Sequence, residues 1–132
     1  MITCREKVNK IFKVEMYRKE NREVPVKDFL ISLPVKLRSK AVRDIELLEK
    51  YGTKLTEPYV KSIKGRENKG LYELRIKFSS DNARIFYFTV KDNRFVLLHG
   101  FIKKTMKTPA REIEQAKRYM KDYIRRCEND ES

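Results

Sequence analysis

The fold is decided by residues 71–101, which read LYELRIKFSSDNARIFYFTVKDNRFVLLHGF. This stretch holds runs rich in β-branched and aromatic residues at 71–78, 83–90 and 94–101, and such runs are typical of strands. Ser79-Ser80-Asp81-Asn82 and Asp92-Asn93 separate the runs, and these residue types favour turns. Strands joined by such short connections pair antiparallel. The sequence therefore predicts a three-stranded antiparallel meander.

The two turns also predict a register, if the first pairs Phe78 with Ala83 and the second pairs Lys91 with Arg94. The predicted cross-strand pairs are Arg75 with Phe86, Phe86 with His99, Lys77 with Arg84, and Arg84 with Phe101. Because side chains alternate along a strand, one face is predicted to carry Glu73, Arg75, Lys77, Arg84, Phe86, Phe88, Leu97, His99 and Phe101. The opposite, apolar face is the predicted core: Tyr72, Leu74, Ile76, Phe78, Ile85, Tyr87, Val96 and Leu98.

The first predicted face mixes cations, one acid and the single histidine with aromatic rings. Cations hold phosphates and exposed rings stack on bases, which is what binding of single-stranded RNA requires. Lysines outside the meander extend this positive surface. The residues predicted to bind RNA are Lys64, Lys77, Phe86, Lys104 and Lys107. A charged strand face is also common as plain solvated surface, with Glu73 paired to Arg75 or Lys77, and that interpretation stays open.

Helices are predicted on both sides of the meander in the chain. Val26, Phe29, Leu30 and Leu33 recur at helical spacing, and Pro34 ends this short helix. A second helix, closed by Gly52, has the apolar stripe Leu37, Ala41, Val42, Ile45, Leu48 and Tyr51. A last helix, capped by Thr108 with Pro109 at its first position, has the stripe Ile113, Ala116, Met120, Tyr123 and Ile124.

Together these elements predict an α+β fold in a single domain over residues 1–132. Its order is an N-terminal strand at 11–18, a helical hairpin packed on the apolar face, the meander, and a C-terminal helix. Residues 53–69 are expected to form a polar connection. Residues 1–10 and 127–132 are expected to be flexible ends.

The charge balance indicates the class of partner. The chain has 32 Lys and Arg against 19 Asp and Glu, a formal charge of +13. This exceeds what solubility requires and favours a nucleic acid, a ribosome or an acidic protein. The start, MITCREKVNK, is too polar for a signal peptide and no apolar run reaches transmembrane length, so we expect a cytoplasmic protein without a membrane partner.

Motifs for metal or cofactor chemistry are not expected. Cys4 and Cys127 lie near opposite ends of the chain, and one histidine with two distant cysteines has no metal-ligand spacing. No P-loop and no serine nucleophile elbow is present. We therefore predict two free thiols, no metal and no cofactor.

An ordered set of segments resembles a known family. The succession GLYELRIKF, NARIFYF and VLLHGFIKKTMKTPAREIEQAKRYM, with the earlier LPVKLRSKAVRDIELLEKYG, resembles the phage-derived HigB-like branch of the RelE/ParE toxin superfamily. The resemblance runs over about residues 11–126. It implies the toxin of a type II toxin–antitoxin pair, with a small HigA-like helix-turn-helix antitoxin as partner in a hetero-oligomer. It also implies cleavage of messenger RNA, commonly on the translating ribosome and without a metal.

By position, the resemblance implies that Arg75, Arg84, His99 and Lys103 carry activity, with Lys104 as a further position. The tyrosine that the RelE branch often has near its C-terminus is not assigned between Tyr119 and Tyr123.

These residue types suit RNA cleavage by attack of the 2′-hydroxyl on the adjoining phosphate. Histidine exchanges protons near neutral pH, so His99 is the first candidate base and Glu73 the second. Arg75 and Arg84 suit bidentate phosphate contacts. Lys103 suits stabilising the developing charge or protonating the leaving oxygen.

Two other functions stay open on the sequence. One is a ParE-like toxin that binds DNA gyrase without catalysis, and the other is a non-enzymatic nucleic-acid-binding accessory protein of a phage. A histidine in line with Arg75 favours the endoribonuclease, because a binding protein needs the charge but no proton carrier.

Overall fold

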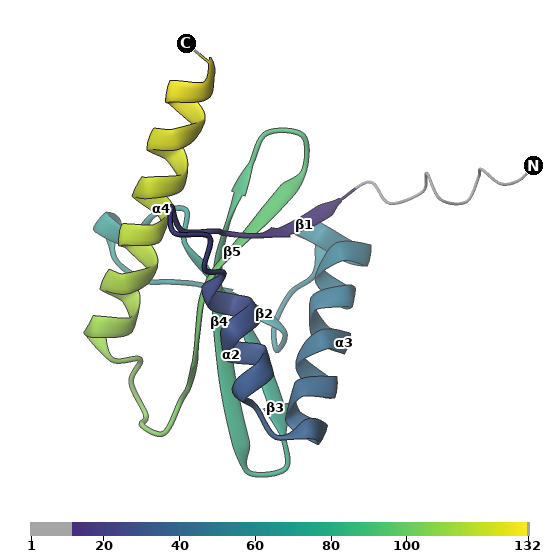
Figure 1. Cartoon of the computed structure of the whole chain (residues 1–132). Coiled ribbons are helices and arrows are strands. Elements are labelled where there is room, and N and C mark those ends of the chain that lie inside the picture. The colour runs from purple at the N-terminus through teal and green to yellow at the C-terminus, as the bar shows by residue number, and fades with distance from the viewer. Residues whose placement is uncertain (1–11, 132) are drawn as a thin grey trace, which may run out of the picture.

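One five-stranded sheet forms the centre of the computed structural model, which describes residues 12–131 (Figure 1). The strand order is β1 (Lys13–Met16), β5 (Arg94–Ile102), β4 (Asp81–Val90), β3 (Tyr72–Phe78) and β2 (Val60–Ser62). β1 runs parallel to β5, and every other neighbouring pair is antiparallel. The predicted α+β layout is confirmed. β2 was missed, because it lies inside the stretch expected to be only a polar connection.

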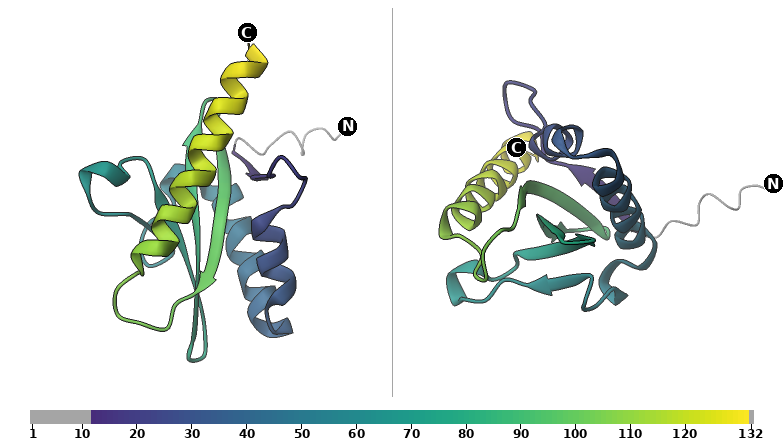
Figure 2. Two further views of the ribbon diagram at one scale, coloured as in Figure 1. Left: turned by 60° about the vertical axis from the view of Figure 1, so that its left-hand side comes forward. Right: turned by 90° about the horizontal axis from the view of Figure 1, so that it is seen from below.

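Helices cover both faces of the sheet (Figure 2). α2 (Pro25–Ser32) and α3 (Val35–Tyr51) pack on one face, as predicted for the hairpin, and α4 (Ala110–Glu131) crosses the other. Short 3-10 turns, η1 (Gly52–Lys54) and η2 (Arg66–Asn68), flank β2. Two apolar cores result. The hairpin core includes Leu37, Leu48, Leu74, Ile85 and Leu97, and the α4 core includes Leu71, Phe86, Phe88, Leu98 and Ala116.

Proline and glycine set the ends of the helical hairpin. Pro25 begins α2, where its missing N–H is harmless. Leu33 is extended because it precedes Pro34, so α2 ends at Ser32. Gly52 closes α3 with a φ of 53°, and its N–H bonds to the carbonyl of Leu48. A Cβ on Gly52 would lie 2.4 Å from the ring of Phe12, so glycine is needed there for space as well as conformation.

Part of the predicted helix stripes is wrong. Val42, Tyr51 and Ile124 are exposed, whereas the carboxylate of Asp44 is buried and pairs with Lys40 at 2.6 Å. Val42 follows buried Ala41 and so lies about 100° further around the helix, away from the buried face. In α4, Tyr119 takes the place expected for Ile124 in the α4 core.

The β3–β4 register differs from the prediction by two residues. The chain turns within Ser79-Ser80, where Ser79 has a φ of 58°, and Phe78 pairs with Asp81 rather than Ala83. Arg75 therefore faces Arg84, and not Phe86. A slip of two residues preserves the face of every side chain, so the cations stay on the predicted side of these two strands.

A β-bulge in β5 corrects the predicted faces of its middle residues. Val90 pairs with Arg94 across a three-residue turn, and the register shifts between Phe86 and Tyr87. The bulge restores the predicted pairs Phe86–His99 and Arg84–Phe101. Between the turn and the bulge the prediction is wrong: Leu97 lies in the hairpin core, and Val96 and Leu98 lie in the α4 core.

The last helix and the termini complete the fold. α4 begins at Ala110, one residue later than predicted, and continues as helix to Glu131 through most of the expected tail. Cys127 on α4 is a free thiol, whereas Cys4 and the predicted lead-in lie outside the described residues. Among residues 12–131, no helix combines the length and apolar content of a membrane span.

Candidate nucleic-acid interface

A cluster of three cations around one buried carboxylate lies where β3, β4 and the end of β5 meet. Arg75 on β3 and Arg84 on β4 are directly opposite each other. Like charges in that position destabilise a sheet. Glu73 offsets the repulsion, with Oε2 at 3.4 Å from Nε of Arg75 and Oε1 at 3.8 Å from Nε of Arg84. We call Glu73, Arg75, Arg84 and Lys103 the arginine cluster.

Two charged atoms of the arginine cluster are buried without a hydrogen bond. Glu73 and Arg84 are only 6% and 7% exposed, and neither Oε1 of Glu73 nor Nε of Arg84 has a hydrogen-bond partner among the described residues. Burial lowers the pKa of Arg84, and positive Arg75 lowers it further, while Glu73 opposes both effects. Unsatisfied buried charges are costly and concentrate at functional sites. An anion bound beside Arg84 would give its guanidinium group a further partner.

Lys103 adds the third cation from the segment that follows β5. Its backbone N–H bonds to the carbonyl of Asn82 at 2.8 Å, and its Nζ donates to the carbonyl of Met106 at 2.8 Å. Partial burial lowers the pKa of Lys103, and the nearby charges of Arg84 and Arg75 act in the same direction against Glu73. A lysine with a lowered pKa gives up its proton more readily than an ordinary one.

Three surface hollows meet at the arginine cluster. The β5 hollow, of about 410 Å³, is lined by Arg84, Lys103, Lys104 and Met106 among others. The β2 hollow, of about 450 Å³, is lined by Glu73, Arg75, Lys103, Lys61, Lys64 and Lys107 among others. The α3 hollow, of about 340 Å³, is lined by Arg75, Arg84, Lys77, Lys40, Pro58, Tyr59 and Asn82. Each cation of the cluster lines two of these three hollows.

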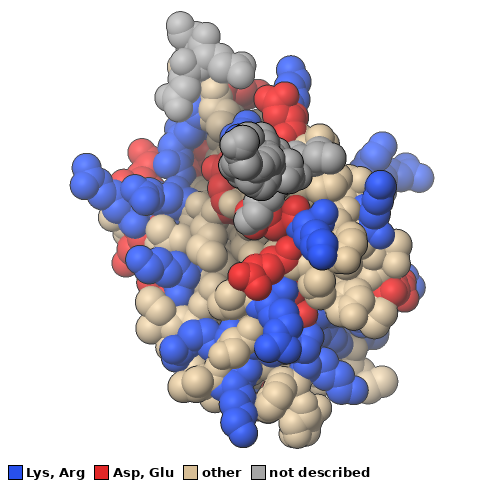
Figure 3. All heavy atoms as spheres, turned by 90° about the vertical axis from the view of Figure 1, so that its right-hand side faces the viewer, with Lys and Arg blue, Asp and Glu red and all other residues tan. Residues whose placement is uncertain are grey.

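The predicted RNA-binding lysines surround these hollows. Lys64 and Lys107 line the β2 hollow, Lys104 lines the β5 hollow and Lys77 lines the α3 hollow, and all four are exposed. Figure 3 shows the neighbouring face of the molecule, where Lys and Arg side chains outnumber acidic ones and the lowest part carries Lys and Arg.

Phe86 is not available to stack on a base. Its side chain is 0% exposed because α4 lies across this part of the sheet, and it contacts the ring of Phe101 at 5.5 Å between centroids. The prediction that Phe86 binds RNA is therefore wrong. The strand pattern placed it on the correct face but did not show that a helix covers that face.

His99 lies beneath α4 and lines none of the three hollows. Its Nε2 is 2.7 Å from Oε1 of Glu112 on α4, and its ring lies beside those of Phe101 and Tyr119. It pairs with Phe86, two residues along β4 from Arg84, which is roughly 7 Å of strand. The structure brings Arg75, Arg84, Lys103 and Glu73 together, but it turns His99 toward Glu112.

Two residues at the cluster were missed by the sequence analysis. Lys40, held by Asp44, reaches the α3 hollow from α3, and Tyr59 reaches it from the segment before β2. No local pattern marks either residue, because each comes near Arg75 only through packing of distant segments.

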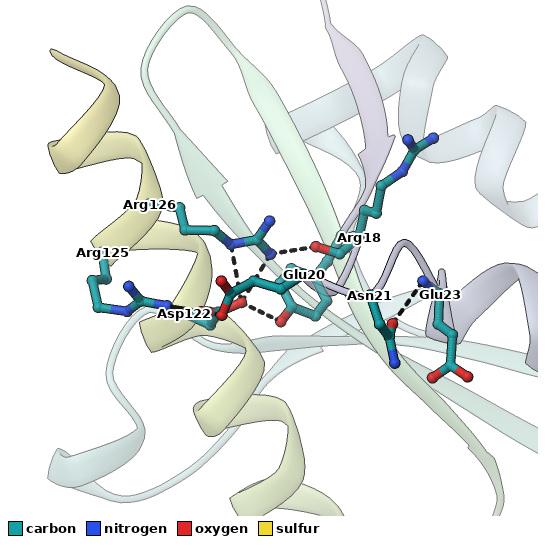
Figure 4. Close-up of polar contacts among 8 residues, drawn as sticks. Arg18, Glu20, Asn21, Glu23, Asp122, Arg125 and Arg126 are labelled. Atoms are coloured by element: carbon teal, nitrogen blue, oxygen red, sulfur yellow. Dashed lines mark hydrogen bonds and ion pairs between the residues drawn. The ribbon is translucent and has the colours of Figure 1, made fainter.

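A second polar cluster joins α4 to the segment after β1 (Figure 4). Asp122 accepts a hydrogen bond from the hydroxyl of Tyr17 at 2.5 Å and pairs with Arg125 at 2.6 Å and with Arg126 at 2.8 Å. Arg126 also donates to the carbonyl of Arg18. These groups satisfy one another, so this cluster fastens α4 and leaves little charge for a ligand.

Within residues 12–131, no three His, Cys, Asp or Glu side chains are grouped as metal ligands.

The chain matches a known protein family. A family model described as "Phage derived protein Gp49-like (DUF891)" matches residues 28–121, which is more than two thirds of the chain and includes the whole arginine cluster. A search of curated proteins found no match.

Proposed function

The chain belongs to the phage-derived Gp49-like family, a RelE/ParE-like toxin family of toxin–antitoxin systems, and from this premise we propose that it is the toxin of a type II pair. We further propose, from the resemblance of its sequence to the HigB-like branch, that it is an endoribonuclease that cuts messenger RNA on the ribosome. The observation that supports cleavage is the arginine cluster, in which Glu73 and Arg84 each bury one charged atom without a hydrogen bond and line open hollows.

The proposed chemistry uses side chains of the arginine cluster. The 2′-hydroxyl attacks the adjoining phosphate, and the bond to the 5′-oxygen of the next nucleotide breaks. Arg75 and Arg84 stabilise the extra negative charge on the phosphate oxygens. Lys103, whose pKa is lowered by burial and by the arginines, donates a proton to the leaving oxygen. This scheme needs no metal ion to supply the nucleophile, because the substrate carries its own.

Glu73 is our candidate for the base that accepts the proton of the 2′-hydroxyl. It lines the β2 hollow, and its Oε1 has no hydrogen-bond partner among the described residues. Its second function in the scheme is to hold the two guanidinium groups on one side of the sheet. His99, the first candidate base on the sequence, is assigned instead to positioning α4 through Glu112.

The proposed partner is an antitoxin with an acidic segment that lies over the three hollows. Nine cations line them: Lys40, Lys61, Lys64, Arg75, Lys77, Arg84, Lys103, Lys104 and Lys107. Such a surface binds RNA non-specifically unless it is neutralised. In a purified complex with the product of the neighbouring gene, Lys104 and Lys107 should be protected from acetylation; equal labelling with and without the partner would contradict masking of this face.

Timed expression separates the possible targets. After a short induction, RNA ends and plasmid supercoiling are measured in the same samples. We expect new RNA ends at defined codons before any change in supercoiling, and we expect neither effect from the Arg75→Ala/Arg84→Ala variant. Arg43→Ala, which removes an exposed cation from α3 away from the hollows, is the matched control and should act as the wild type. A change in plasmid supercoiling that comes first, while the RNA is still intact, would favour the gyrase-binding alternative.

A further inference from the structure

We propose that Tyr59 is a stacking platform for one unpaired nucleobase of the RNA, next to the phosphate held by Arg75 and Arg84. The inference rests on the proposed function and extends it, because it assigns a base-binding site that the strand pattern had placed at Phe86. It identifies the ligand as an unpaired base of single-stranded RNA.

The first support is the availability of the ring. Tyr59 is 38% exposed, and among residues 12–131 no other aromatic ring stacks on it. The buried tyrosines behave differently: Tyr17 stacks on Tyr119 and Tyr72 stacks on Tyr87. An exposed ring with a free face is what a splayed base needs.

The second support is position. The carbonyl of Tyr59 accepts a hydrogen bond from the N–H of Arg75 at 2.7 Å, so the backbone fixes this residue beside the arginine cluster. Its own N–H bonds to the carbonyl of Thr56 at 3.0 Å. The side chain lines the α3 hollow together with Arg75, Arg84 and Lys77. An aromatic face beside several cations suits a nucleotide, whose phosphate and base need these two kinds of contact.

The arrangement also gives a path for the strand. Arg75 lines both the α3 hollow and the β2 hollow. A single strand that crosses Arg75 therefore places one base on Tyr59 and continues along Lys61, Lys64 and Lys107. Double-stranded RNA cannot use the ring in this way, because its bases are stacked inside the helix.

The test measures binding of a short single-stranded RNA whose 2′-hydroxyl at the cleavage site is replaced by hydrogen, so that it binds without being cut. Tyr59→Ala should weaken binding by about 5- to 150-fold, the range for loss of one stacked base. Tyr59→Phe should bind as the wild type. Tyr51→Ala is the matched control, because Tyr51 is 42% exposed yet lines none of the three hollows, and it should change nothing.

An abasic scan of the same RNA locates the base. Removing one particular base should weaken binding by wild type and have no further effect on Tyr59→Ala. If Arg75→Ala weakens binding but Tyr59→Ala does not, the stacking proposal is wrong and the proposed function survives. If the wild type neither binds this RNA nor cuts messenger RNA in a translating extract, the proposed function is wrong and the stacking proposal fails with it.

Discussion

Glu73 and His99 are the two residues whose roles the structure separates most clearly. Sequence pattern placed both on one face as candidate bases, and only the packing of α4 distinguishes them. Glu73 lies between the two arginines, whereas His99 contacts Glu112 and two aromatic rings. A residue that acts by positioning a helix affects stability more than the chemical step, and a base affects the chemical step more than stability.

Substitution of Glu73 should therefore mainly slow cleavage, and substitution of His99 should mainly lower the free energy of unfolding. Glu73→Gln keeps the shape of the side chain but removes its charge, and should slow RNA cleavage by roughly 10²-fold or more. His99→Gln should keep cleavage within about tenfold and lower the free energy of unfolding by about 1 kcal/mol through the weakened contact with Glu112. Cleavage rates and urea unfolding curves of the folded variants check both expectations. A folded His99→Gln protein with a 10²-fold slower rate would restore His99 as the base.

At the scale of elements, α4 is the part of the fold that shapes the site most. It closes the α4 core over Phe86, while Arg75 and Arg84 at the end of the sheet line open hollows. One of its polar attachments to the rest of the chain is the cluster of Asp122 with Tyr17, Arg125 and Arg126, and another is the contact of Glu112 with His99. Detaching α4 would expose the apolar rings beneath it.

The Tyr17 hydroxyl gives this attachment a pH dependence. Burial, followed by the hydrogen bond to Asp122, raises the pKa of Tyr17 to about 12. A group whose pKa is raised in the folded state contributes stability that is fully present below its unfolded pKa near 10 and is lost as pH rises through the folded value. The loss from Tyr17 between pH 10 and pH 12 should be about 2 kcal/mol.

Tyr17→Phe isolates this contribution, because it removes the hydroxyl and keeps the ring. At pH 7 the variant should be less stable by about 1 kcal/mol, since Asp122 loses one hydrogen bond but keeps its arginines. Its stability should then fall less steeply than that of the wild type above pH 10. Urea unfolding at pH 7, 10 and 11.5 measures both quantities, with Tyr51→Phe as control. Parallel pH curves for wild type and Tyr17→Phe would contradict the assignment.

The sequence predicted the helices and longer strands better than it predicted how the strands pair. Helical spacing and strand alternation predicted the hairpin, the meander and α4, because these patterns reflect burial of one face of each element. The strand register was harder to predict from the sequence. Ser79-Ser80 makes a tighter turn than the predicted four-residue connection. The alternation of polar and apolar residues does not reveal the bulge in β5. β2 has only three residues and is too short for alternation to identify.

Strand alternation also predicted part of the candidate site. A register error of two residues left Arg75 and Arg84 on one face, so their meeting was predictable from alternation alone. The burial of Phe86 and the contact of His99 with Glu112 depend on α4, which comes later in the chain, and a local sequence pattern does not show such packing. Tyr59 and Lys40 join the site only through tertiary contacts.

At the scale of the whole molecule, the charge of +13 should appear as salt-dependent RNA binding. If about five phosphates are contacted, the affinity for single strands should fall with a log–log salt slope of about −3.5. Lys64→Ala/Lys107→Ala removes two cations of the β2 hollow and should reduce the slope by about 1.4. A filter-binding series that shows no salt dependence would contradict an electrostatic RNA interface.

The most direct test of the central claim is the rate of messenger RNA cleavage in a translating extract by Arg75→Ala and Arg84→Ala. Neither side chain belongs to an apolar core, so circular dichroism should show both variants folded. Each should cut at least about 10²-fold more slowly than wild type, because each loses charge stabilisation in the transition state. Arg43→Ala should cut at the wild-type rate. Folded Arg75→Ala and Arg84→Ala proteins that both cut as fast as the wild type would show that the arginine cluster is not the active site.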